Sequence, residues 1–242
     1  MRLAWIGRGS KSQHVGGLCF DNLQWMDTFL LARLSRVKTR TQHSLSVFCS
    51  ALQWEIDPFH SLACQLVADP YNTSMLLFGQ MNGTRQDEEK TAAHINQLLR
   101  KLKTSHTNAV DKVLKSYSTR RGSAIQVALS AHVNLSDVAH RGRWTMNDYA
   151  TFLESVAEMS TSDQKVARVL AGWTDPTCSV CPPRLSYAAG SIDTAKLKTE
   201  FAKDIFLHYQ GRLASAEFVR ALASSLLLYY YEATVQLAPH HL

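Results

Sequence analysis

The segment from Tyr117 to Trp144 constrains the fold most, because it places arginines beside two short helices with apolar periodicity. Arg120 and Arg121 stand directly before Gly122-Ser123, where a turn is expected to lead into the first helix. Its apolar positions recur at helical spacing and are Ala124, Ile125, Val127, Ala128 and Ala131. Backbone N–H groups at a helix start attract anions, and a guanidinium group binds two phosphate oxygens at once. The pattern predicts a phosphate site; the alternative is a surface arginine pair on an ordinary helix.

The second helix of this segment is expected to begin after Asn134 and to end near His140-Arg141-Gly142. Asn is a favoured N-cap residue, and Gly142 is a suitable C-cap. Arg143 and Trp144 follow directly. A tryptophan in such a place is commonly a buried anchor, so its interpretation as a site residue depends on the arginines beside it.

These two runs, Tyr117-x-x-Arg120-Arg121-Gly122-Ser123-Ala124 and Arg141-Gly142-Arg143-Trp144, resemble the tyrosine recombinases of the lambda-integrase type. The chain is most similar to the Crypton-type recombinases of eukaryotic transposable elements, in which a His-x-x-Arg-Arg-Gly-Gly-Ala stretch precedes an Arg-Gly-x-Trp stretch. The resemblance continues to Gly172-Trp173 and, more weakly, over nearly the whole chain. It implies a mainly α domain with a small β-hairpin or sheet, which is an α+β catalytic domain of the tyrosine-recombinase type.

The resemblance also implies a site in which basic side chains bind a DNA phosphodiester and a tyrosine attacks it. Arg120 matches the second arginine of the family and Lys38 its hairpin lysine. Trp144 matches a His or Trp that contacts the phosphate. Lys11, at the start of a helix expected to end near Leu23, stands where the family has its first arginine, and lysine lacks the bidentate fork. Tyr117 stands where the family has histidine, and a phenol is a poor acid near neutral pH.

The nucleophilic tyrosine of the family has no counterpart at its expected place. Ungapped alignment puts that position at Ser155, or at Leu153 if the register slips, in a helix expected over residues 145–159. The tyrosine of that helix, Tyr149, comes too early by more than a turn. We therefore predict a catalytically decayed or domesticated recombinase domain. The alternatives are an active strand transferase using Tyr149 or a tyrosine of a partner protomer, and a structural or assembly relic without a DNA role.

Basic residues are clustered along the chain, whose formal net charge is +6. Seven Lys and Arg lie between residues 97 and 121 against one acidic residue, and seven lie within residues 1–48 against two. Such clustering is typical of a polyanion-binding surface, here double-stranded DNA, although charged helices also simply solvate a fold. The side chains predicted to contact DNA are Arg40, Lys101, Lys103, Lys115, Arg121 and Arg143.

The remaining elements follow from local patterns. Residues 29–34 and 44–49 predict a β-hairpin whose turn carries Lys38. Asp57-Pro58 predicts the start of a helix whose core-facing side is His60, Leu62, Ala63, Leu66 and Val67. Residues 69–85 are expected to form a loop, a short strand and a loop. Residues 87–103 predict an amphipathic helix with Arg100, Lys101 and Lys103 outward. Its inward positions are Ala92, Ile95, Leu98, Leu99 and Leu102. Thr161 to Gln164 resembles a capping box before a helix over residues 165–171 that Gly172 closes.

We expect three parts: a catalytic domain over residues 1–173 without the separate N-terminal core-binding domain, a linker over 174–190 and a helical extension over 191–242. Two helices are expected to finish the chain, the second with an apolar stripe of Phe218, Leu222, Leu226, Tyr229 and Tyr230. Homo-oligomerisation through these helices is expected from the family. The apolar run over residues 221–238 includes Glu232, which favours a packed helix over a membrane span.

The cysteines indicate the compartment. There are five, an odd number in a chain large enough to fold without disulfides, which favours a reducing environment. The resemblance implies the nucleus, and the first ten residues lack the apolar core of a signal peptide. A lone Cys178-x-x-Cys181 pair is weak evidence for zinc, so we predict neither a metal nor a cofactor.

Overall fold

The computed structural model describes residues 17–35, 42–50, 53–71, 75–77, 93, 96–101, 114–130, 133–142, 161–183, 202–209, 211–213 and 215–237. Its strands are β1 (Leu23–Trp25), β2 (Leu30–Ser35) and β3 (Gln42–Val47). Its α-helices are α3 (Pro58–Ala68), α5 (Ser116–Ala128), α6 (Leu135–Gly142), α8 (Thr161–Leu170) and α10 (Ala216–Leu237). Short 3₁₀ helices are η1 (Phe20–Asn22), η2 (Trp54–Ile56) and η3 (Leu207–Tyr209). The chain is mainly helical with a small antiparallel sheet, which confirms the predicted α+β class.

The sheet has the order β1-β2-β3, so β2 is its central strand. Leu30 of β2 pairs with Trp25 on one side and with Val47 on the other. Three of its leucines and Ala32 are buried while Arg33 is exposed, as expected of a strand covered on both faces. The predicted hairpin is therefore confirmed. Its turn, with Lys38 and Arg40, lies outside the described residues.

The chain before the hairpin differs from the prediction. A helix ending near Leu23 was expected, whereas η1 ends at Asn22 and Leu23 begins β1. The side chain of Asn22 accepts a hydrogen bond from the backbone N–H of Cys19 at 3.0 Å, which closes the short turn. Leu23 is buried and Gln24 exposed, and this alternation fits a strand pairing with β2.

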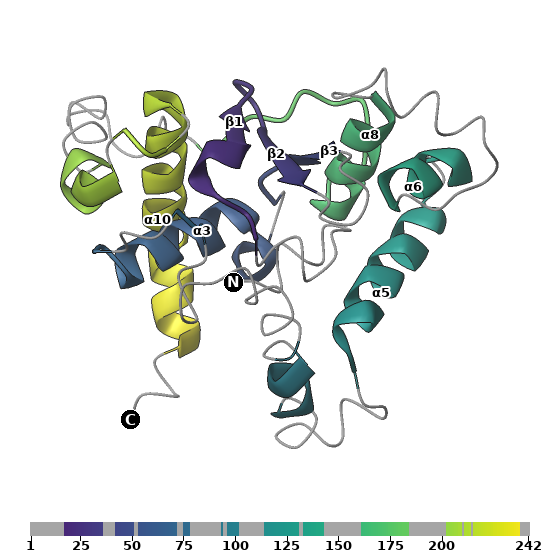
Figure 1. Cartoon of the computed structure of the whole chain (residues 1–242), viewed down its shortest axis with the longest axis horizontal. Coiled ribbons are helices and arrows are strands. Elements are labelled where there is room, and N and C mark those ends of the chain that lie inside the picture. Colours follow the sequence, from purple (N-terminus) through teal and green to yellow (C-terminus); the bar gives the residue numbers. More distant parts are fainter. Residues whose placement is uncertain are drawn as a thin grey trace.

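Helices lie on both sides of the sheet, with α3 and α10 on one side and α8, α6 and α5 on the other (Figure 1). Trp25 of β1 joins the first side, because its ring lies 6.0 Å from that of Phe59 in α3 and 5.3 Å from that of Phe218 in α10. One apolar core includes residues from Leu18 to Ala223. Residues of the predicted catalytic domain, linker and extension thus contribute to one core; the boundaries at 173 and 190 stay a prediction.

Helix α3 begins where the sequence predicts. The carboxylate of Asp57 accepts from the backbone N–H groups of Phe59 and His60 at 2.6 and 3.1 Å, and Pro58 occupies the first turn. Its other oxygen accepts from the N–H of Ser50 at 2.9 Å, which ties the helix start to the chain after β3. Val67, predicted to face the core, is 44% exposed, since the buried face is centred on the positions of Phe59 and Leu66.

A second, smaller core joins α5, α6 and α8. Its buried residues are Val127, Val133, Val138, Val166 and Leu170. Helix α8 ends in a Schellman motif: Gly172 has φ 85°, its N–H donates to Val169 O, and the N–H of Trp173 donates to Arg168 O. This end was predicted. The start was not, because α8 begins at Thr161, and the residues read as a capping box are already helical.

Other predicted apolar faces are only partly buried. In residues 96–101, which are helical, Leu99 is buried but Leu98 is 39% exposed. In α10 the stripe through Phe218 and Leu222 is buried, while Tyr230 is 70% exposed. Among the described helices, including α10, none is both long and apolar enough to span a membrane.

Candidate nucleic-acid interface

Part of the predicted DNA-binding surface lies among the described residues. Tyr117, Arg120 and Arg121 belong to α5, Lys115 precedes it, and Lys101 ends the helical residues 96–101. The other predicted site residues lie outside the described residues and are Lys11, Lys38, Arg40, Lys103, Arg143, Trp144 and Tyr149. The convergence of Lys38, Arg120 and Trp144 on one phosphate stays a prediction.

The arginine pair does not lie at a helix start, so that prediction is wrong. Helix α5 begins at Ser116, because the hydroxyl of Ser118 accepts from the backbone N–H of Lys115 at 3.1 Å and closes a first turn before the arginines. Arg120 and Arg121 are therefore in the second turn, where backbone N–H groups are already used within the helix. The dipole of the helix acts mainly within its first turn, near Lys115.

Helix α5 exposes Arg121 to solvent, and the exposed Lys115 directly precedes the helix. The helix contains neither Asp nor Glu. On the opposite side Val127 is 1% exposed and packs in the core shared with α6 and α8. Ile125, predicted to be buried, is 50% exposed, because it follows Arg121 by one turn on the outer side. Lys115 and Arg121 are thus available to an anionic partner, next to the exposed apolar Ile125 and Leu129.

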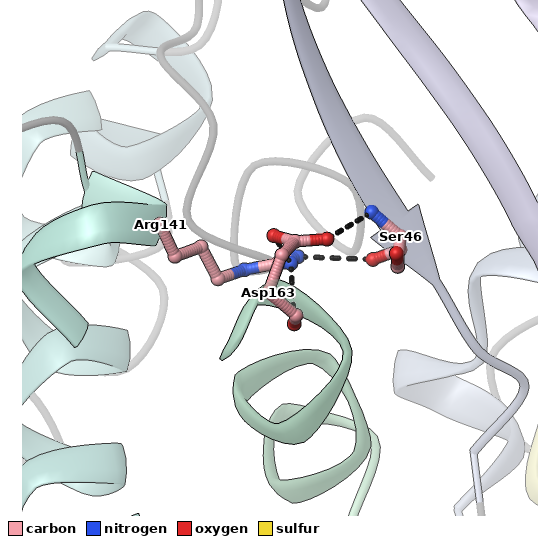
Figure 2. A network of polar contacts seen from close by, with 3 residues as sticks. All are labelled: Ser46, Arg141 and Asp163. Atoms are coloured by element: carbon pink, nitrogen blue, oxygen red, sulfur yellow. Dashed lines mark hydrogen bonds and ion pairs between the residues drawn. The ribbon is translucent and has the colours of Figure 1, made fainter. Parts of the chain in front are cut away.

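The end of α6 carries a buried ion pair that links three elements (Figure 2). Nη1 of Arg141 donates to the carboxylate Oδ1 of Asp163 in α8 and to the backbone oxygen of the same residue, the latter at 3.3 Å. Nη2 donates to the backbone oxygen of Ser46 in β3 at 3.1 Å. The carboxylate Oδ2 accepts from the N–H of Ser46 at 2.6 Å. The two charged side chains are only 2% and 7% exposed.

Helix dipoles and a sheet edge explain why this pair forms. Arg141 is in the last turn of α6 and Asp163 in the first turn of α8, so each charge faces the helix end of opposite partial charge. Strand β3 is at the edge of the sheet. Both backbone polar groups of Ser46 therefore need partners outside the ladder, and the ion pair supplies them.

The network gives Arg141 a role that the sequence did not reveal. Its guanidinium group is engaged inside the protein, so the first arginine of the Arg-Gly-x-Trp run is not a surface cation. Sequence reasoning also missed Asp163 and Ser46. A basic residue at the end of one helix and an acidic residue at the start of another are a signal that could have suggested the pair, whereas Ser46 contributes backbone atoms and carries no side-chain signal.

A second polar network ties α3 to α10. Nδ1 of His60 lies 3.3 Å from the backbone oxygen of Ser225, and its Nε2 lies 3.5 Å from Sγ of Cys64. Burial lowers the pKa of His60, partly offset by the Ser225 hydrogen bond, and burial raises the pKa of Cys64. A neutral thiol beside a neutral imidazole is not an activated nucleophile. His60 instead joins the two helices, through Ser225 and the ring of Tyr229 in α10.

The Cys-x-x-Cys pair is attached to the core. The backbone oxygen of Cys181 accepts from Sγ of Cys49 at 3.6 Å, and Val180 is 2% exposed. Within the part of the chain that the structure describes, no group of three or more His, Cys, Asp or Glu side chains could hold a metal ion.

Comparison with protein-family models, with curated proteins and with solved structures gave no match.

Proposed function

We propose that this chain is a DNA-binding domain of the tyrosine-recombinase type, derived from a mobile element, that grips duplex DNA without cleaving it. The observation that carries the proposal is the Arg141 network. It holds the end of α6, from which the run toward Trp144 continues, against β3, the strand that follows the turn with Lys38. Helix α5, which contains Arg120, packs on α6. Helices α5 and α6 and strand β3, which contain or adjoin predicted phosphate ligands in the sequence, thus belong to one packed body.

Charge supports DNA as the partner. Exposed Lys115 and Arg121 flank the start of an acid-free helix, and the chain as a whole has a net charge of +6. Cations on a rigid element attract the phosphate backbone without regard to base sequence. We also propose the nucleus as the compartment. Assembly of the chain through α10, where Leu228 and Val235 are exposed, is part of the same proposal. The oligomeric state in solution tests the assembly.

The test of DNA binding is the salt dependence of the affinity for a labelled duplex. Replacing a phosphate ligand reduces the slope of log K against log salt by about 0.9. We expect this reduction for Arg120→Ala, Arg121→Ala and Lys38→Ala. The matched control is Arg220→Ala, which removes a positive charge from the surface of α10, where Arg220 pairs with Glu217. Absence of binding, or equal slopes for Arg121→Ala and Arg220→Ala, would contradict the proposal.

Loss of cleavage follows from the residue at the nucleophile position. The hydroxyl of Ser155 lies closer to its backbone than a phenol would, and it is far less acidic than a tyrosine hydroxyl, whose ordinary pKa is about 10. It is therefore a poor replacement in both the attack and the reversal of a phosphotyrosine step. A nicked suicide substrate should trap no covalent adduct. An adduct that disappears in Tyr149→Phe would show instead that the chain is an active strand transferase.

A further inference from the structure

We infer that Arg141 and Asp163 are positioning residues for phosphate binding, and that Arg141 itself contacts no DNA. Their ion pair sets where the end of α6 lies relative to β3. This inference rests on the proposed function and assigns a role to two buried residues that are not among the predicted DNA contacts.

The guanidinium group of Arg141 is buried and bonded within the protein. Arg141 directs Nη1 to Asp163 and Nη2 to Ser46, and the whole residue is 3% exposed. A phosphate would have to displace a carboxylate and a backbone carbonyl from a site that solvent hardly reaches. Removing either partner from a buried charge is strongly unfavourable. Arg141 therefore acts inside the protein, and we assign the contact with DNA to other residues of the predicted site.

The carboxylate of Asp163 joins the arginine to strand β3. One oxygen of Asp163 binds the arginine, and the other binds the N–H of Ser46 at 2.6 Å. Because a guanidinium fork donates in fixed directions, these contacts define an orientation as well as a distance. Ser46 lies in a six-residue strand that begins directly after the hairpin turn, and Arg143 is two residues beyond Arg141. A shift at the ion pair would therefore move the end of α6 relative to β3, the two described elements that adjoin the predicted cations in the sequence.

The DNA affinity of Asp163→Asn should change in opposite directions depending on whether Asp163 acts only through its charge or also positions the cations. The substitution removes a negative charge and raises the net charge from +6 by one. A more positive protein should bind a polyanion equally well or more tightly. If Asp163 positions the cations, binding should instead become weaker despite the added charge. The matched control is Glu217→Gln, which makes the same change of charge on the exposed start of α10.

The experiment measures the dissociation constant for a labelled duplex at several salt concentrations, scaled to the folded fraction from circular dichroism. We expect Asp163→Asn to bind DNA about tenfold more weakly than the wild type. Replacing a residue that orients a metal ligand lowers metal affinity by about 10–100-fold, and the expected loss of DNA affinity is at the lower end of that range. Its salt slope should also fall, which a purely structural role would not cause in the folded fraction. Glu217→Gln should bind like the wild type or more tightly. Equal affinities for the two variants would overturn the inference.

A second variant keeps the test decisive if Asp163→Asn does not fold. Arg141→Met combined with Asp163→Leu removes the ion pair without changing net charge, and such apolar replacements are often tolerated. We expect weaker DNA binding and a smaller salt slope from this folded double variant. Wild-type affinity in it would overturn the inference while leaving the proposed function intact. Failure of the wild type itself to bind DNA would overturn the proposed function, and the inference with it.

Discussion

Breaking the Arg141–Asp163 ion pair from one side should destabilise the fold severely. In Asp163→Ala the guanidinium group of Arg141 stays in a site where its side chain is 2% exposed, without its anion. An uncompensated buried charge of this kind costs about 3–5 kcal/mol. The N–H of Ser46 also loses its acceptor, and an unsatisfied buried donor costs about 1–3 kcal/mol. We therefore expect the upper end of the first range for Asp163→Ala.

Asp163→Asn separates these two contributions. The side-chain amide oxygen can still accept from Ser46, so mainly the charge is lost, and a value near the lower end, about 3 kcal/mol, is expected. Urea denaturation followed by circular dichroism measures both free energies of unfolding. Glu217→Gln removes a carboxylate from an exposed pair with Arg220 and should leave the midpoint close to that of the wild type. A loss below about 1 kcal/mol in Asp163→Ala, typical of exposed pairs, would refute the reasoning.

Two further predictions concern stability. Gly172→Ala places a side chain at φ 85° and should lower the free energy of unfolding by about 1–2 kcal/mol. Gly122→Ala lies in a helix with open space around the new methyl group and should raise it by about 0.5–1 kcal/mol. Thermal unfolding measures both variants, and shifts of the midpoint in the same direction would contradict this explanation. Burial lowers the pKa of His60, so the unfolded chain binds its proton more readily. Stability should therefore fall as pH decreases below about 6.5 and towards the lower folded pKa. In His60→Gln the dependence of the unfolding free energy on pH should be weaker than in the wild type, and an unchanged dependence would exclude His60 as its source.

Local signals predicted those elements whose ends are set by nearby residues. The helix start at Asp57-Pro58 and the glycine end at Gly172 were found because the capping group is adjacent to the helix it closes. The central strand was found because a strand covered on both faces is an unbroken apolar run. These elements need no knowledge of the rest of the fold.

The predictions were wrong where a less common local hydrogen bond, or a partner distant in the sequence, determines the structure. Helix α5 starts at Ser116, before the predicted start at Gly122-Ser123, because the Ser118 hydroxyl accepts from the N–H of Lys115. The prediction gave more weight to the Gly122-Ser123 turn signal than to this bond. Leu23 is in a strand because β2 pairs with it. Asp163 was read as part of a cap, whereas it binds a side chain 22 positions away and a backbone amide 117 positions away. Sequence spacing alone does not encode such partners.

A geometric role explains the buried Arg141–Asp163 ion pair better than a stabilising role does. Apolar residues of similar volume often give equal or greater stability than a buried charge pair, since the charges first lose their hydration. What apolar contacts lack is direction, while Arg141 and Asp163 fix α6, α8 and β3 through donors and acceptors with defined orientation. Under the proposed function, gripping a phosphate backbone requires cations held at fixed relative positions, whereas cleavage further requires a tyrosine hydroxyl in line with the phosphate. A chain with serine at the nucleophile position can therefore lose the second property and still keep the first.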